Sequence, residues 1–96
     1  MAKNNQPISS EDFLKVEELF KALHPTFIER LRGLYPIKEK EWKISLLIKM
    51  GFPQHQIASL LCMSEEGVHS SRRRMYKKVF QKDGAAKLWD DFLESL

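Results

Sequence analysis

The chain has 96 residues, of which 43% are hydrophobic, and its 16 Lys and Arg against 13 Asp and Glu give a formal net charge of +3. This composition suits one small folded domain and excludes a wholly disordered chain. A single Cys excludes an internal disulfide framework, and the polar start MAKNNQPISS and the short apolar runs exclude a signal peptide and a membrane span. We expect a cytoplasmic protein without membrane contact, either free-standing or the output end of a larger protein.

Helical periodicity runs through almost the whole chain, and strand-like alternation is missing. Residues 1–9 read as a flexible polar tail, and residues 10–36 as a pair of helices. Ser10 is the candidate N-cap of the first helix, and Pro25 suits the first turn of the second. Two apolar stripes are expected to face the core: Phe13, Val16, Phe20 and Leu23, then Phe27, Ile28, Leu31 and Leu34.

Residues 37–82 are predicted to hold three more helices, and residues 83–96 a sixth. The first of them covers about 38–50 and stops at Gly51, and a shorter one follows within 53–63. The sixth helix follows a turn at Asp83-Gly84, and its expected inward residues are Leu88, Trp89, Phe92 and Leu96. The prediction is therefore an all-α bundle of about six helices that forms one compact domain.

The segment 64–80, SEEGVHSSRRRMYKKVF, concentrates positive charge, because six of the sixteen Lys and Arg lie between Arg72 and Lys82. On a helical wheel of about 100° per residue, Val68, Met75 and Val79 share one direction. The opposite direction carries Glu66, Ser70, Arg73 and Lys77. A disordered basic tail would not keep such an apolar seam, so we expect a packed helix whose outer face suits an anionic partner.

The spacing before this helix is that of a helix-turn-helix. A helix ends at Gly51, a short helix carries Ile57-Ala58 at its centre, and the turn Cys62-Met63 leads to Ser64, which caps the long helix. In such a motif the second helix lies in the DNA major groove. Cys62 is expected to be a small buried hydrophobe in the turn.

The stretch IKEKEWKISLLIKMGFPQHQIASLLCMSEEGVHSSRRRMYKKV, residues 37–79, resembles the LuxR/GerE-type helix-turn-helix. It is most similar to the C-terminal helix-turn-helix of Bacteroidetes transcriptional regulators. The resemblance covers 43 of 96 residues without gaps and departs from the family pattern at Lys38, Pro53, Gln56 and Gly67. The positions that match the pattern are Glu41, Gly51, Ile57, Ala58, Leu61, Met63, Ser64, Val68 and Lys78.

The resemblance implies sequence-specific binding of double-stranded DNA by a bacterial regulator, with residues of about 64–80 as the recognition helix. Its base-facing positions fall on His69, Ser70 and Arg73, in agreement with the wheel. An Arg at such a position can bind guanine O6 and N7. The positions assigned to phosphate contacts are Arg74, Lys77, Lys78, Gln54 and Arg72. For Arg72 a structural role beside an acid such as Glu41 is an equal alternative.

The same sequence bears on other classes of function. No His or Cys pair has metal-ligand spacing, and no Gly-rich phosphate loop or nucleophile elbow occurs, so we expect no metal, no cofactor and no enzyme activity. A protein-interaction module derived from a helix-turn-helix, with RNA polymerase among its partners, is the alternative, as is a domain like sigma-factor region four. The sixth helix either forms a homodimer or caps the domain's own core, and the sequence leaves both open.

Overall fold

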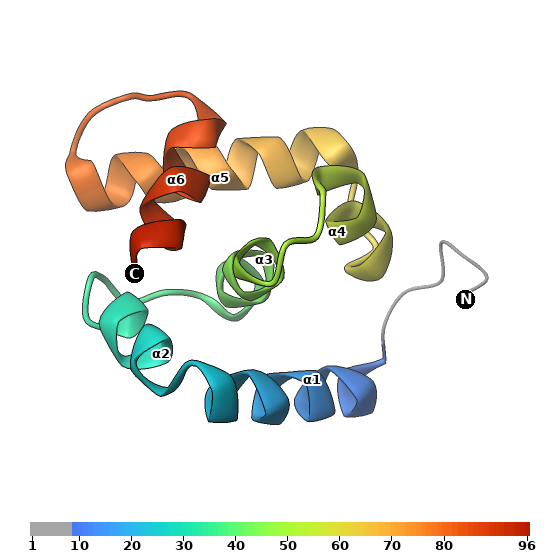
Figure 1. Ribbon diagram of the computed structural model, residues 1–96. Helices are drawn as coiled ribbons and strands as arrows, with labels where there is room; N and C mark the ends of the chain where they lie inside the picture. Colours follow the sequence, from blue (N-terminus) through green and yellow to red (C-terminus); the bar gives the residue numbers. More distant parts are fainter. Residues whose placement is uncertain (1–8) are drawn as a thin grey trace.

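Six helices form residues 9–96, the part of the chain that the computed structural model describes (Figure 1). No strand occurs within residues 9–96, so the predicted all-α class is confirmed. The predicted tail, residues 1–9, lies outside the described residues except for Ser9. The helices are α1 (Ser10–Leu23), α2 (Pro25–Arg32), α3 (Glu39–Lys49), α4 (Gln54–Leu60), α5 (Glu65–Phe80) and α6 (Ala86–Ser95).

The first helix begins one residue earlier than predicted. Ser9, not Ser10, is the N-cap of α1, and its Oγ accepts a hydrogen bond of 3.1 Å from the backbone N–H of Asp12. Two adjacent serines have the same capping chemistry, and only the backbone turn decides between them. Phe13 and Phe20 are buried as predicted, but Leu23 is 68% exposed, because it lies on the flank of α1 beyond the packed Phe13–Phe20 edge.

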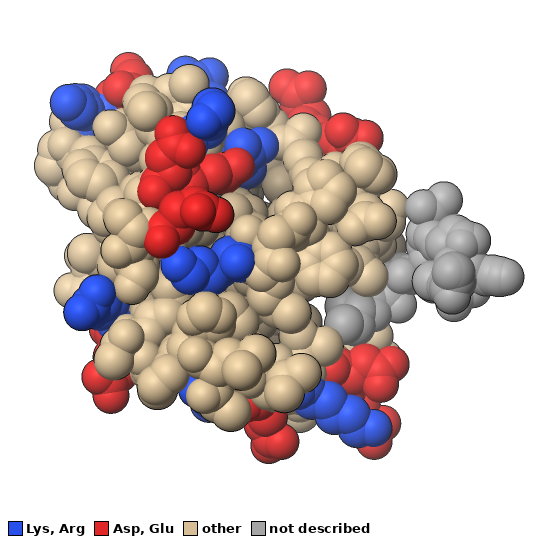
Figure 2. Space-filling model, viewed as in Figure 1, with Lys and Arg blue, Asp and Glu red and all other residues tan. Residues whose placement is uncertain are grey.

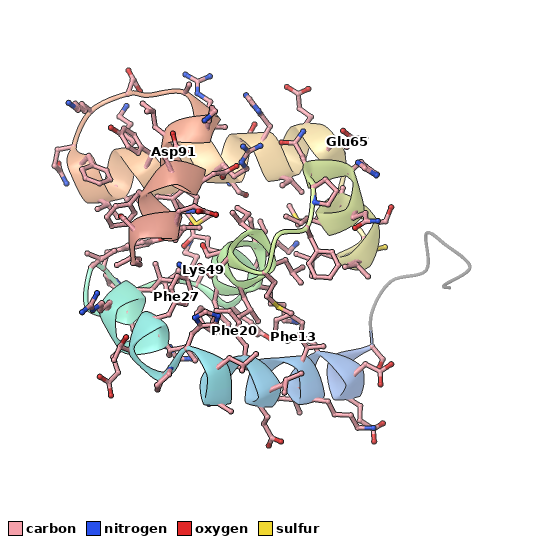
Figure 3. The ribbon with its side chains drawn as sticks, viewed as in Figure 1. Phe13, Phe20, Phe27, Lys49, Glu65 and Asp91 are labelled. Atoms are coloured by element: carbon pink, nitrogen blue, oxygen red, sulfur yellow. The ribbon has the colours of Figure 1, made fainter. Side chains whose placement is uncertain are left out.

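Helix α3 is the centre of the domain and lies between the α1–α2 pair and the α5–α6 pair (Figure 1). Ile44, Leu46 and Leu47 are buried on several sides of it, as expected of a helix that other helices surround. Phe13 and Phe20 project from α1 toward α3, and Phe27 approaches it from α2 (Figure 3). The Phe27 ring lies 6.4 Å from the Trp42 ring, which joins α2 to α3.

Helix α6 closes the domain across α5 and α3, with Trp89 and Leu93 fully buried. The sequence interpretation missed Leu93 and wrongly placed Leu88 inward, where the structure leaves it 42% exposed. Helical spacing within α6 predicts that one side is apolar, whereas the neighbours α3 and α5 determine which edge of that side is covered. Leu34 is likewise 38% exposed, because it follows the last turn of α2.

Two cations hold the C-terminal end of α6 against α2 and α3. Lys49 Nζ donates to the carbonyl oxygens of Leu93 and Glu94, both at 3.0 Å, and Arg30 donates to the carbonyl oxygen of Leu96. The Leu93 carbonyl also accepts from the backbone N–H of Leu96 at 3.1 Å, and the two cations supply further hydrogen bonds at this end of α6 and favour its negative helix end. Within residues 9–96, no helix is both long and apolar enough to cross a bilayer.

Candidate nucleic-acid interface

The candidate interface is built on α4, the turn after it and α5. The turn reverses the chain through Cys62, whose φ of 58° is left-handed, and the N–H of Met63 donates to the carbonyl of Ala58 at 2.9 Å. Ser64 then caps α5, and its Oγ accepts from the N–H of Gly67 at 2.9 Å. The predicted cap is therefore present, and α5 is held at a defined angle to α4.

Cys62 corrects one prediction: the thiol is exposed, not buried. In the left-handed region the Cβ leaves the backbone in a different direction from that of a helical residue, so helical periodicity does not apply to this position. The burial of Cys62 that was predicted from the apolar residues around it is therefore wrong.

One face of α5 is buried against the rest of the domain. Val68, Ser71 and Met75 are buried along it, and Val79 is partly buried against the core. Ala58 of α4 is also buried, which allows α4 and α5 to approach closely. The seam predicted from the wheel therefore fixes which side of α5 remains outside.

The other face of α5 presents positive charge to solvent. Ser70 is half-buried, whereas the exposed residues of α5 other than Phe80 are Glu65, Glu66, His69, Arg73, Arg74, Lys77 and Lys78. His69 and Arg73 make no hydrogen bond or ion pair with any residue of 9–96, and Arg74 donates to Ser71 Oγ at 3.2 Å. Lys77 lies 3.7 Å from Asp83, but both side chains are largely exposed, so that pair contributes little. The structure thus places together the predicted base-facing residues and two predicted phosphate contacts.

Arg72 has a different environment from its two neighbours. Its guanidinium binds Asp90 of α6 through two hydrogen bonds, Nε to Oδ1 at 3.1 Å and Nη2 to Oδ2 at 2.6 Å. Its Nη1 also donates to Oε1 of Gln54 at the start of α4. The acid partner is therefore Asp90 and not Glu41. Through these contacts Arg72 and Gln54 join α4, α5 and α6, and the phosphate contacts predicted for both residues stay a prediction.

The buried carboxylate of Glu41 engages another predicted phosphate contact. It accepts from Lys78 Nζ at 3.2 Å, from the Tyr35 hydroxyl at 3.0 Å and from the backbone N–H of Lys38 at 3.1 Å. Burial raises the pKa of Glu41, but these hydrogen bonds and the Lys78 charge outweigh burial, and the pKa lies below its ordinary value. For Tyr35, burial and the adjacent carboxylate raise the pKa of the hydroxyl above its usual range. Glu41 is therefore ionised, Tyr35 is neutral, and Lys78 remains 40% exposed.

Acidic side chains gather over α6 on the face seen in Figure 2. Asp91 and Glu94 of α6 are exposed, whereas Asp90 is half-buried beside Arg72. Glu65 lies at the start of α5, at the far end from the Lys77–Lys78 pair (Figure 3). The positive face of α5 is thus bordered by acids at its N-terminal end and along α6, and its charge is strongest toward the C-terminal half.

Sequence reasoning missed the roles of Asp90 and Tyr35. Asp90 lies 18 residues from Arg72, and nothing in their spacing indicates the pair. For Glu41 a local signal exists, because it stands three residues after the N-cap Lys38, where an acid accepts the N-cap N–H. No comparable signal indicates that Tyr35 and Lys78 meet at that same carboxylate.

In comparisons with protein-family models, with curated proteins and with solved structures, no match to this chain was found.

Proposed function

We propose that this domain binds double-stranded DNA, with α5 as the recognition helix of a LuxR/GerE-type helix-turn-helix. The observation that carries the proposal is the division of α5 into a buried seam, Val68 and Met75, and an exposed face that carries His69, Arg73, Arg74 and Lys77. A packed helix with exposed cations on one side matches the shape and charge of the major groove. Such a module would act in the cytoplasm of a bacterium, as the output of a transcriptional regulator.

Within this proposal the residues of the outer face divide by chemistry. Arg73 is the candidate reader of a base, because its guanidinium is exposed and without a partner among residues 9–96. His69 and Ser70 add hydrogen bonds to base edges. Arg74 and Lys77 bind phosphates, which sets affinity and register but reads no sequence. Arg72 and Gln54 are left out of the interface because Arg72 binds both Gln54 and Asp90.

The first experiment is an anisotropy titration of labelled duplex DNA at 50 and 200 mM salt. About three phosphate contacts predict a loss of affinity of about 40-fold between these conditions, because each contact releases condensed counterions. A matched control is Lys87→Gln, which removes one exposed positive charge from α6, outside the proposed contact residues of α5. The control is expected to bind like the wild type. Failure to bind any duplex at low salt sinks the proposal.

A second experiment separates base reading from phosphate binding. Duplexes enriched from a random pool by the wild-type protein are compared with those enriched by Arg73→Ala and Lys77→Ala. Arg73→Ala is expected to lose about 1–3 kcal/mol on the preferred duplex and to relax one position of the motif. Lys77→Ala is expected to weaken all duplexes alike. An unchanged motif with Arg73→Ala removes this residue from the base-reading role.

A protein partner is the second candidate function. Three leucines of α1, Leu14, Leu19 and Leu23, are at least 60% exposed, and acids lie over α6 and at the start of α5. Such surfaces suit a protein partner such as RNA polymerase, or a role like that of sigma-factor region four. Self-association through α6 also stays a prediction, although α6 already buries Trp89 and Leu93 within its own chain. Sedimentation of the chain with and without duplex DNA distinguishes a monomer, a dimer and a DNA complex.

A further inference from the structure

A cleft opens between the connection from α2 to α3 and the C-terminal half of α5. It has a volume of about 580 Å³. Tyr35 and Pro36 form one wall, and α5 and its C-cap form the other. The residues from the second wall are Arg74, Lys77, Lys78 and Gln81.

The charge of this cationic cleft is of one sign. Three of its six lining residues are cations, and none is an acid. Two neighbouring hollows differ, because one is lined by Arg32 with Glu39 and the other by those two residues together with Glu17 and Lys43. Opposite charges in one hollow neutralise each other, whereas three cations that line the same cleft attract an anion.

The hydrogen bonds within the walls leave donors for such an anion. Arg74 uses Nη2 on Ser71, and its other guanidinium donors have no partner within residues 9–96. Lys78 gives one hydrogen bond to Glu41, so an ammonium with three donors and 40% exposure can bind a second acceptor. Lys78 Nζ also lies 5.4 Å from the centre of the Tyr35 ring, which holds the ammonium at the wall.

We propose that the cationic cleft binds one phosphate group, with Arg74 and Lys77 as its main ligands, Lys78 as a shared one and Tyr35-Pro36 as the opposing wall. The inference rests on the proposed function for the source of that phosphate, which is the backbone of the DNA strand beside α5. Arg74, Lys77, Lys78 and Gln81 follow helical spacing along one side of α5, adjacent to Arg73. The interface therefore extends beyond the helix-turn-helix to the α2–α3 connection.

Glu41 sets the strength of this site. Its carboxylate is 8% exposed and lies behind Lys78 and Tyr35, where it neutralises part of the positive charge of the cleft. Substitution Glu41→Gln removes that negative charge and releases Lys78 toward the phosphate. The variant is expected to bind phosphate more tightly than the wild type even where its fold is less stable.

The test is a titration of the ¹⁵N-labelled full chain with inorganic phosphate, with sodium chloride adjusted to hold the ionic strength constant. The amide resonances of Tyr35, Lys77 and Gln81 are expected to shift as phosphate is added, and these shifts are expected to reach saturation. Arg74→Gln is expected to weaken this binding by about tenfold, because a charged hydrogen bond is lost, whereas Lys87→Gln leaves it unchanged. Shifts that do not saturate, or that Arg74→Gln and Lys87→Gln affect equally, overturn the proposal.

A second arm repeats the titration with duplex DNA and separates the two sources of phosphate. If DNA is the source, the Tyr35 amide shifts in the complex, and Arg74→Gln lowers the slope of log affinity against log salt by about 0.9. The phosphate site in the cleft is overturned, while the proposed function stands, if the chain binds duplex DNA without a shift of the Tyr35 amide resonance and Arg74→Gln leaves the salt slope unchanged. Saturable inorganic phosphate without any duplex binding means the reverse: the proposed function fails, and the cleft serves a free phosphorylated compound.

Discussion

The edges of the buried seam and the outer face of α5 use the same kind of residue for opposite purposes. At the two edges of the seam, Arg72 and Lys78 lie beside the carboxylates of Asp90 and Glu41. On the outer face, Arg73 has no partner within residues 9–96, although it follows Arg72 directly in the chain. The difference teaches that the role of a cation on this helix depends on whether another helix brings a carboxylate to it.

The largest expected effect is a difference in stability between a substitution in the apolar seam of α5 and one on its exposed face. Met75→Ala should lower the free energy of unfolding by about 2–5 kcal/mol, because it leaves a cavity where Met75 is fully buried. His69→Ala removes an exposed side chain of the same helix and should change the free energy of unfolding by less than about 0.5 kcal/mol. Urea denaturation of both variants measures the difference. Equal losses would mean that α5 is not packed through the Val68–Met75 seam.

A smaller effect is expected from the ion pair that joins α5 to α6. Arg72→Met or Asp90→Asn should each cost about 1–3 kcal/mol of unfolding free energy, since each leaves a half-buried partner without its charged hydrogen bonds. The double variant should cost less than the sum of the two. A double-mutant cycle by urea denaturation measures the coupling, and strict additivity would argue against a direct Arg72–Asp90 interaction. The neighbouring variant Arg73→Ala should leave stability unchanged.

The turn that sets the direction of α5 offers a stabilising change of about 1 kcal/mol. Cys62 holds a left-handed backbone with φ of 58°, which costs a non-glycine residue about 1 kcal/mol or more. Cys62→Gly should therefore raise the unfolding midpoint, and Cys62→Val should lower it, because a β-branched residue tolerates this conformation least. Thermal unfolding of both variants provides the measurement. Equal unfolding midpoints for Cys62→Gly and Cys62→Val would contradict a left-handed backbone at this position.

The smallest expected effect is a pH dependence from Glu41. Its pKa is lowered in the folded state, so its contribution is fully present above its ordinary pKa of 4.5 and is lost as pH falls through the folded value. The wild type should therefore lose more unfolding free energy between pH 6 and pH 3 than Glu41→Gln, which cannot titrate there. Urea midpoints across this range measure the loss. Parallel curves for the two proteins would mean that the bonds to Tyr35, Lys38 and Lys78 are not formed in solution.

Local features were the part of the fold and site that the sequence could predict. Helical spacing predicted the number and order of the helices, and the wheel of residues 64–80 separated the Val68–Met75 seam from the exposed Arg73 and Lys77. Ser64 was predicted as a cap because capping depends on groups only three residues apart. All these signals lie within a few turns of one helix, where the geometry is fixed by the backbone itself.

Long-range pairings were decided only by the tertiary structure. Arg72 meets Asp90 across 18 residues, Lys78 meets Glu41 across 37, and the cationic cleft joins Tyr35 to the far end of α5. The same packing exposes Leu88 and buries Leu93. Periodicity describes one helix at a time, whereas burial and charge pairing depend on which neighbour covers each edge. The sequence therefore determined that α5 is basic and amphipathic, and the packing of α3 and α6 against it decided which of its cations remain free.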